Sequence, residues 1–181
     1  CLILGMGIPT IPNYIITSSI AAPALLKLGV PLIVSHMFVF YFGIMADLTP
    51  PVALAAFAAA SISKASPMRT GIKATQIAIA GFVVPFIAIY DPSLMLQGNY
   101  GWTDVVYVSF KALTAIVLWG ATVVGFLRGP LSPLQRGMAF AAAACLIAAL
   151  PLTDQVGFAL AALVIGWNVW SSRIRAVPAP G

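Results

Sequence analysis

The sequence predicts an all-α integral membrane protein. Hydrophobic residues make up 61% of the chain and charged residues 7%, which leaves too little polar surface to cover a soluble globule of 181 residues. The apolar residues also form runs of helical length, and most charges fall between these runs. In chain order we expect one arm of a re-entrant hairpin at 1–29, a broken transmembrane helix at 32–63 and four further transmembrane helices. One of the four is expected at 68–90, and three belong to a C-terminal extension at 97–181.

The hairpin begins with a predicted helix break. Gly5, Gly7 and Pro9 lie close together inside an otherwise apolar run, and this combination interrupts a helix. We expect residues 5–12 to form the tip of the hairpin, inside the membrane. A simply kinked spanning helix is the alternative.

The second arm of the hairpin is predicted over residues 14–28. Either Thr10 or Asn13 can cap its start, because both side chains can accept hydrogen bonds from free backbone amides. The run Lys27-Leu28-Gly29 predicts its end, with a cation in the last turn and a glycine stop.

The broken helix is the clearest candidate for a functional element. Its halves, 32–46 and 52–63, reach about 22 and about 18 Å at 1.5 Å per residue, so each is too short to cross a hydrocarbon layer about 30 Å thick. Between them lies Asp47, followed by the pair Pro50-Pro51. Proline removes amide donors and disfavours helix at the residue before it, so backbone carbonyls become free near the middle of the membrane.

Such freed carbonyls, together with hydroxyls and one carboxylate, suit a hard cation such as sodium. A carboxylate within a membrane-spanning segment indicates a functional site, whereas the structural alternative is that Asp47 only caps a neighbouring turn. The candidates for the sodium site are Gly5, Gly7, Thr10, Asn13, Asp47, Thr49 and Pro50.

The charges alternate from one set of connections to the next. Seven of the nine basic residues fall in three regions that share one side of the predicted membrane, and three of the four acids fall on the other. By the positive-inside rule, the loops at 64–73 and 128–136 and the C-terminus are expected in the cytoplasm. The seven bases are Lys64, Arg69, Lys73, Arg128, Arg136, Arg173 and Arg175, and the three acids are Asp91, Asp104 and Asp154. Because the bases are dispersed, the net charge of +5 does not indicate a nucleic-acid partner.

The C-terminal extension is expected to cross at 105–127, 137–152 and 155–170. Lys111 lies inside the first of these spans, where it can extend its ammonium outward to the interface, or alternatively pair with a substrate anion. Aromatic residues in the preceding outer loop suit an interfacial belt, with contact to a binding protein as the alternative. His36 is expected to hydrogen-bond a neighbour rather than carry protons.

Enzyme functions are disfavoured. Intramembrane proteolysis needs paired catalytic groups, and this chain offers one midplane carboxylate, one histidine and no glutamate. Transport is therefore the leading hypothesis, and a non-transporting scaffold subunit is the alternative. Cys1 precedes a helix-like apolar run, so we expect the chain to be a fragment.

Four segments carry a specific family resemblance. They are Gly5-Met6-Gly7-Ile8-Pro9-Thr10, Ala21-Ala22-Pro23-Ala24-Leu25, His36-Met37-Phe38-Val39-Phe40-Tyr41-Phe42-Gly43 and Leu48-Thr49-Pro50-Pro51-Val52-Ala53-Leu54-Ala55-Ala56-Phe57. Over residues 1–96 the chain resembles the large membrane subunit of TRAP transporters, in particular the fused permeases that work with TAXI-type binding proteins.

This resemblance implies half of an elevator-type transporter with inverted repeats, in the bacterial inner membrane. A periplasmic TAXI-type solute-binding protein would deliver a small organic anion, commonly a carboxylate, and sodium would be the coupling ion, with no other cofactor. The remainder of the permease and a small membrane subunit, or its fused equivalent, would complete the assembly in the lipid bilayer. The resemblance places a sodium site between residues 5–10 and 47–50, and we expect Pro9, Thr10 and Pro51 near the substrate.

Overall fold

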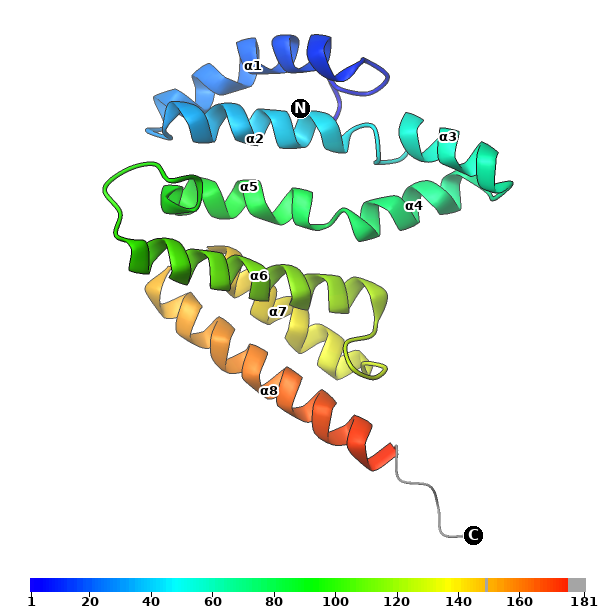
Figure 1. The fold of residues 1–181 in the computed structure, drawn as a ribbon, viewed down its shortest axis with the longest axis vertical. Coiled ribbons are helices and arrows are strands. Elements are labelled where there is room, and N and C mark those ends of the chain that lie inside the picture. The colour runs from blue at the N-terminus through cyan, green and yellow to red at the C-terminus, as the bar shows by residue number, and fades with distance from the viewer. Residues whose placement is uncertain (149, 176–181) are drawn as a thin grey trace. The chain divides into compact units, whose positions relative to one another are not determined.

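The computed structural model describes residues 1–148 and 150–175, and within these ranges the regular structure is helical, with no strand. Figure 1 traces the helices along the chain. Contacts divide the chain into two compact units, residues 1–108 and 109–181. The predicted boundary after residue 96 stays a prediction. The helices are α1 (Thr10–Lys27), α2 (Leu32–Met45), α3 (Leu54–Ser63), α4 (Pro67–Ile77), α5 (Ala80–Tyr90), η1 (Pro92–Met95), α6 (Trp102–Val124), α7 (Pro133–Ala148) and α8 (Pro151–Arg175).

In the first unit, α1 and α2 form a helical hairpin (Figure 1). As predicted, α1 ends at Lys27, and Gly29 follows with a φ of +84° that favours glycine. The hydroxyl of Tyr14 lies 2.7 Å from Nδ1 of His36, which confirms that this histidine hydrogen-bonds a neighbour. The hairpin therefore brings polar side chains of both helices together within apolar surroundings.

Aromatic rings join α2 to α5. Phe42 packs edge-on against Phe82 and Phe86, with ring centroids 5.9 and 5.5 Å apart. Phe38 packs against Phe86 at 5.4 Å. These edge-to-face pairs add to the stabilisation that comes from close packing. They hold the first half of the broken helix against α5.

The predicted broken helix is present, as α2 and α3 separated by residues 46–53. Both halves are among the short apolar helices, and neither is long enough to cross a membrane alone. The predicted helix at 68–90 is found as two pieces, because α4 ends at Ile77 and α5 begins at Ala80. Over this junction Gly81 N–H bonds to the carbonyl of Ala78, an i+3 contact that tightens the turn between the two helices.

In the second unit, α7 packs along α8 through small residues. Ala139, Ala142 and Ala143 of α7 are fully buried. Gly157 of α8 sits so close to Leu146 that a Cβ there would lie 2.8 Å from its Cγ. Small side chains allow helix backbones to approach closely, which is how helices associate in a bilayer.

Among the described residues, three helical segments are long and apolar enough to cross a membrane: Pro67–Tyr90, Trp102–Val124 and Leu152–Ser172. They correspond to three of the four predicted crossings outside the broken helix, with shifted bounds. The fourth, predicted at 137–152, is found as α7, which has 16 residues and belongs with the shorter apolar helices. A full crossing by α7 therefore stays a prediction.

Candidate ion site at two helix breaks

The first break lies before α1. Gly5 N–H bonds to the carbonyl of Cys1 at 2.8 Å, and Gly7 has a φ of +78°, so the chain turns instead of continuing as a helix. Pro9 then precedes the first helical residue, Thr10. Helix α1 begins earlier than predicted, so Pro12 lies in its first turn. Backbone amides of the first turn have no partner within the helix, so the amide hydrogen that proline lacks is not missed there.

Asn13 does not cap α1, contrary to the prediction, and α1 has no side-chain cap. Instead Asn13 is 1% exposed, and its Nδ2 donates to the carbonyl of Gly43 on α2 at 2.9 Å. Its Oδ1 has no hydrogen-bond partner among the described residues. A buried polar oxygen without a partner is costly, so it marks a place where a donor or a cation would be stabilising.

The second break follows α2. Asp47 N–H and Leu48 N–H bond to carbonyls three residues earlier, so the end of α2 tightens before the chain leaves the helix. Thr49 Oγ1 donates to the carbonyl of Met45 at 2.6 Å. Ala55 N–H reaches back to the carbonyl of Asp47 at 3.1 Å and ties the start of α3 to the break.

Helix α4 supports this second break from the side. Thr75 Oγ1 lies 3.1 Å from the carbonyl of Leu48 and 2.9 Å from the carbonyl of Gly71 in its own helix, so its hydroxyl proton is shared between the break and α4. A Cβ at Gly71 would lie 3.0 Å from Cγ of Pro50, so the proline sits directly against α4. The irregular backbone is thus packed against α4 on one side, and a break within a membrane requires contact with protein or water.

The two breaks lie against one another. A Cβ on Gly5 would be 3.0 Å from Cβ of Ala46, and one on Gly7 would be 3.9 Å from Cγ1 of Val52. Asn13 lies beside this contact, because its side chain approaches both Gly5 and Gly43, which is in the last turn of α2. Segments far apart in sequence therefore bring two stretches of irregular backbone and a buried side-chain oxygen to one place.

Asp47 and Thr10 take different positions relative to this junction. Asp47 is half-buried, and its carboxylate accepts no hydrogen bond within residues 1–148 and 150–175, so the capping role weighed as an alternative is not found. Thr10 is exposed at the start of α1, and no contact described for it reaches residues 46–53. Gly5, Gly7 and Asn13 are thus the residues that the structure brings to the second break.

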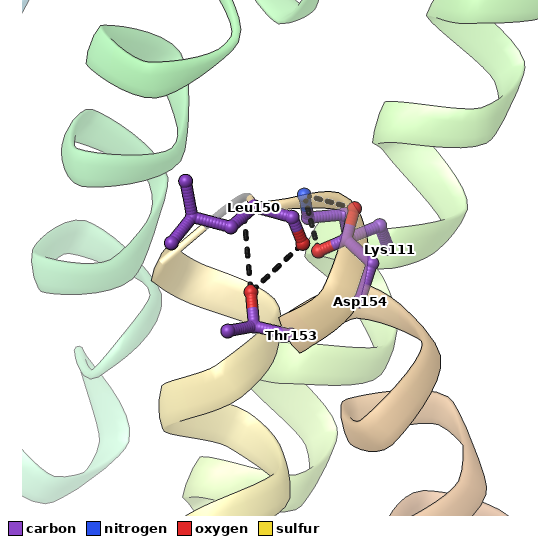
Figure 2. A network of polar contacts seen from close by, with 4 residues as sticks. All are labelled: Lys111, Leu150, Thr153 and Asp154. Atoms are coloured by element: carbon purple, nitrogen blue, oxygen red, sulfur yellow. Dashed lines mark hydrogen bonds and ion pairs between the residues drawn. The ribbon is translucent and has the colours of Figure 1, made fainter.

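Charged residues in the second unit form an ion pair that the sequence analysis missed (Figure 2). Lys111, on α6, is 1% exposed and does not extend to the interface as predicted; its Nζ lies 2.8 Å from both carboxylate oxygens of Asp154. Asp154 lies in the first turn of α8 instead of an outer loop, because α8 begins at Pro151 and Leu150 N–H bonds to Thr153 Oγ1. Proline at the first helical position was the available signal for this helix start.

These features define a class of protein: a helical membrane protein in which two helix breaks pack against one another. The comparison with known families narrows the class. Residues 1–102 match the family described as "Tripartite ATP-independent periplasmic transporter, DctM component". The chain therefore belongs to the DctM family and is a multi-pass membrane permease component of a TRAP transporter. No curated protein and no solved structure matches the chain.

Proposed function

We propose that the chain is a component of a permease for the sodium-coupled import of a small organic anion, a carboxylate, which a periplasmic solute-binding protein of the TAXI type delivers. The observation that supports this most directly is the junction of the two breaks, where Asn13 Oδ1 is buried without a partner among the described residues, beside carbonyl oxygens of irregular backbone. A hard monovalent cation is stabilised by such oxygens. Asp47 supplies a negative charge at the same break.

The anion has a place beside the cation. Helix α1 begins directly after Pro9, and α3 begins shortly after Pro51, so two helix N-termini lie at the breaks. The positive end of a helix dipole favours a carboxylate. We assign Pro9, Thr10 and Pro51 to the substrate side of the site. Sodium bound nearby would lower the cost of holding the anion within the membrane.

Sodium dependence of stability is the test. A ligand that binds only the folded state stabilises it by about 2.7 kcal/mol at a hundredfold excess over its Kd. We expect the full-length protein in detergent to unfold at a higher temperature in sodium chloride than in potassium chloride. The difference should fall strongly in Asp47→Ala and in Asn13→Ala, which remove oxygens from the junction.

Asp104→Asn is the matched control, because Asp104 is an exposed carboxylate that accepts Gly101 N–H at 2.8 Å at the start of α6. The Asp104→Asn protein should keep the full difference in unfolding temperature between sodium chloride and potassium chloride, even if it is less stable in both salts. Equal unfolding temperatures of the unmodified protein in the two salts would refute sodium coupling at this junction and favour a scaffold role.

We further propose the elevator mode of transport, with this chain supplying one of two inverted repeats in the bacterial inner membrane. The pairing of a re-entrant segment with a broken helix supports this, since such pairs carry substrate at the midplane of secondary transporters. The distribution of basic residues supports a cytoplasmic location of the loops at 64–73 and 128–136.

A further inference from the structure

Helix α4 has an inner face and an outer face of different chemistry. The inner face packs against the second break and α3, because a Cβ at Gly71 would lie 3.5 Å from Cβ of Ala53 and 3.4 Å from Cε1 of Phe57. Arg69 and Lys73 lie two residues before and two residues after Gly71. At about 100° per residue, both fall on the opposite side of the helix, and both are exposed. We call these two residues, one helical turn apart, the basic face of α4.

No group of the described chain neutralises the basic face. Within residues 1–148 and 150–175, no ion pair and no side-chain hydrogen bond involves Arg69 or Lys73. The sequence has no acid between residues 48 and 90, and Lys64 adds a third positive charge shortly before α4. The basic face is therefore available to an anion from outside the chain.

Exposed apolar side chains lie beside the basic face. Met68 is 48% exposed and Ile72 is 46% exposed. Each directly precedes one of the two cations, so this apolar flank lies about 100° around the helix from the basic face. A helix with apolar and basic surfaces side by side suits the boundary between acyl chains and lipid headgroups.

The basic face lies at one end of a candidate membrane-spanning segment, Pro67–Tyr90. The part of that segment after Lys73, residues 74–90, has no charged residue and reaches about 25 Å at 1.5 Å per residue. A hydrocarbon layer about 30 Å thick therefore begins close to Lys73. Arginine and lysine extend their charged ends toward the headgroups while their stems stay along apolar surface. Both cations can thus reach the depth of the phosphates.

We propose that the basic face of α4 binds the headgroup of an anionic phospholipid. The phosphate is bound between Arg69 and Lys73, whose Cβ atoms are about 5–6 Å apart in this register. The guanidinium supplies charge-assisted hydrogen bonds and the ammonium a second positive charge. One acyl chain of the same lipid lies along Met68 and Ile72. The proposal does not depend on sodium coupling.

Position and charge favour a lipid over an acidic segment of another protein. Headgroups surround the end of any membrane-spanning segment, so a lipid phosphate is present at this depth. A protein partner would have to supply carboxylates and also cover Met68 and Ile72. A phospholipid brings the anion and the apolar chain in one molecule, and basic clusters at the end of a membrane span attract anionic lipids in this way.

Lipid binding to the full-length protein tests the proposal. Native mass spectrometry would compare phosphatidylglycerol with phosphatidylcholine of the same acyl chains. We expect each cation to contribute about fivefold to the preference for phosphatidylglycerol. Arg69→Gln and Lys73→Gln should each lower that preference about fivefold, and the double variant about 25-fold, while binding of phosphatidylcholine stays unchanged. Lys73→Arg keeps the charge and should keep the preference.

Lys27→Gln is the matched control. Lys27 is also an exposed helical lysine, in the last turn of α1, but it is the one base in residues 1–63 and so has no second cation beside it. Its variant should keep the preference of the unmodified protein. An unchanged preference in the double variant, or an equal loss in Lys27→Gln, would overturn the proposal. So would a loss that affects phosphatidylcholine equally, because charge would then not be what binds the lipid.

Discussion

Gly5 is the residue on which the contact between the two breaks most directly depends. A Cβ at this position would lie 2.5 Å from Asn13 Nδ2 and 3.0 Å from Ala46 Cβ. Gly5→Ala should therefore lower the stability by about 1–3 kcal/mol, the usual cost of overpacking. Thermal unfolding in detergent measures this. Gly137→Ala is the control, since a Cβ there meets nothing within 4 Å; equal effects of the two substitutions would contradict the close contact.

Lys111 and Asp154 make a second prediction at this scale. Lys111→Met removes the ammonium from the carboxylate of Asp154, whose side chain is 12% exposed, and we expect the free energy of unfolding to fall by about 3 kcal/mol. The double variant Lys111→Met, Asp154→Leu replaces both charges by apolar groups and should recover most of that loss. Denaturant unfolding of Lys111→Met, of Asp154→Leu and of the double variant gives the free energies for a double-mutant cycle. Strictly additive losses would show that the two side chains do not interact.

At the scale of elements, α4 stabilises the break between α2 and α3. Thr75→Val keeps the shape of the side chain and removes the donor to the Leu48 carbonyl. We therefore expect the free energy of unfolding to fall by about 1 kcal/mol. Hydrogen exchange of residues 46–53 should become faster at the same time. Thr114→Val is matched to it, because the Thr114 hydroxyl bonds within its own helix, to the carbonyl of Phe110. If both variants leave exchange at the break unchanged, α4 does not hold it.

The elements differ in how well the sequence predicts them. Pro50-Pro51 predicts the break after α2 because proline lacks an amide donor and restricts the residue before it. The end of α1 at Lys27 follows from the cation and the glycine beyond it. Helix α1 begins earlier than predicted, at Thr10, because residues 10–13 begin the helix without any side-chain cap. The turn between α4 and α5 has no proline or glycine at residues 78–79 to mark it.

At the scale of the whole molecule, the distribution of charge predicts orientation. We expect a membrane-impermeant maleimide, added to intact spheroplasts, to label Asn99→Cys and not Ser66→Cys, in a background with Cys1 and Cys145 replaced. Both positions are exposed in loops or at a helix cap. Permeabilised cells are the control, because both sites should then react. Labelling of Ser66→Cys from outside would reverse the predicted orientation.

The sequence by itself determined the membrane class, the family resemblance and the two helix breaks, because apolar composition and proline chemistry act locally along the chain. The tertiary structure decided which groups meet. Asn13 faces α2 instead of capping its own helix, and Lys111 finds Asp154 on α8. No local pattern carries this information, because a buried polar group is satisfied by whichever partner packing brings near, often many residues away.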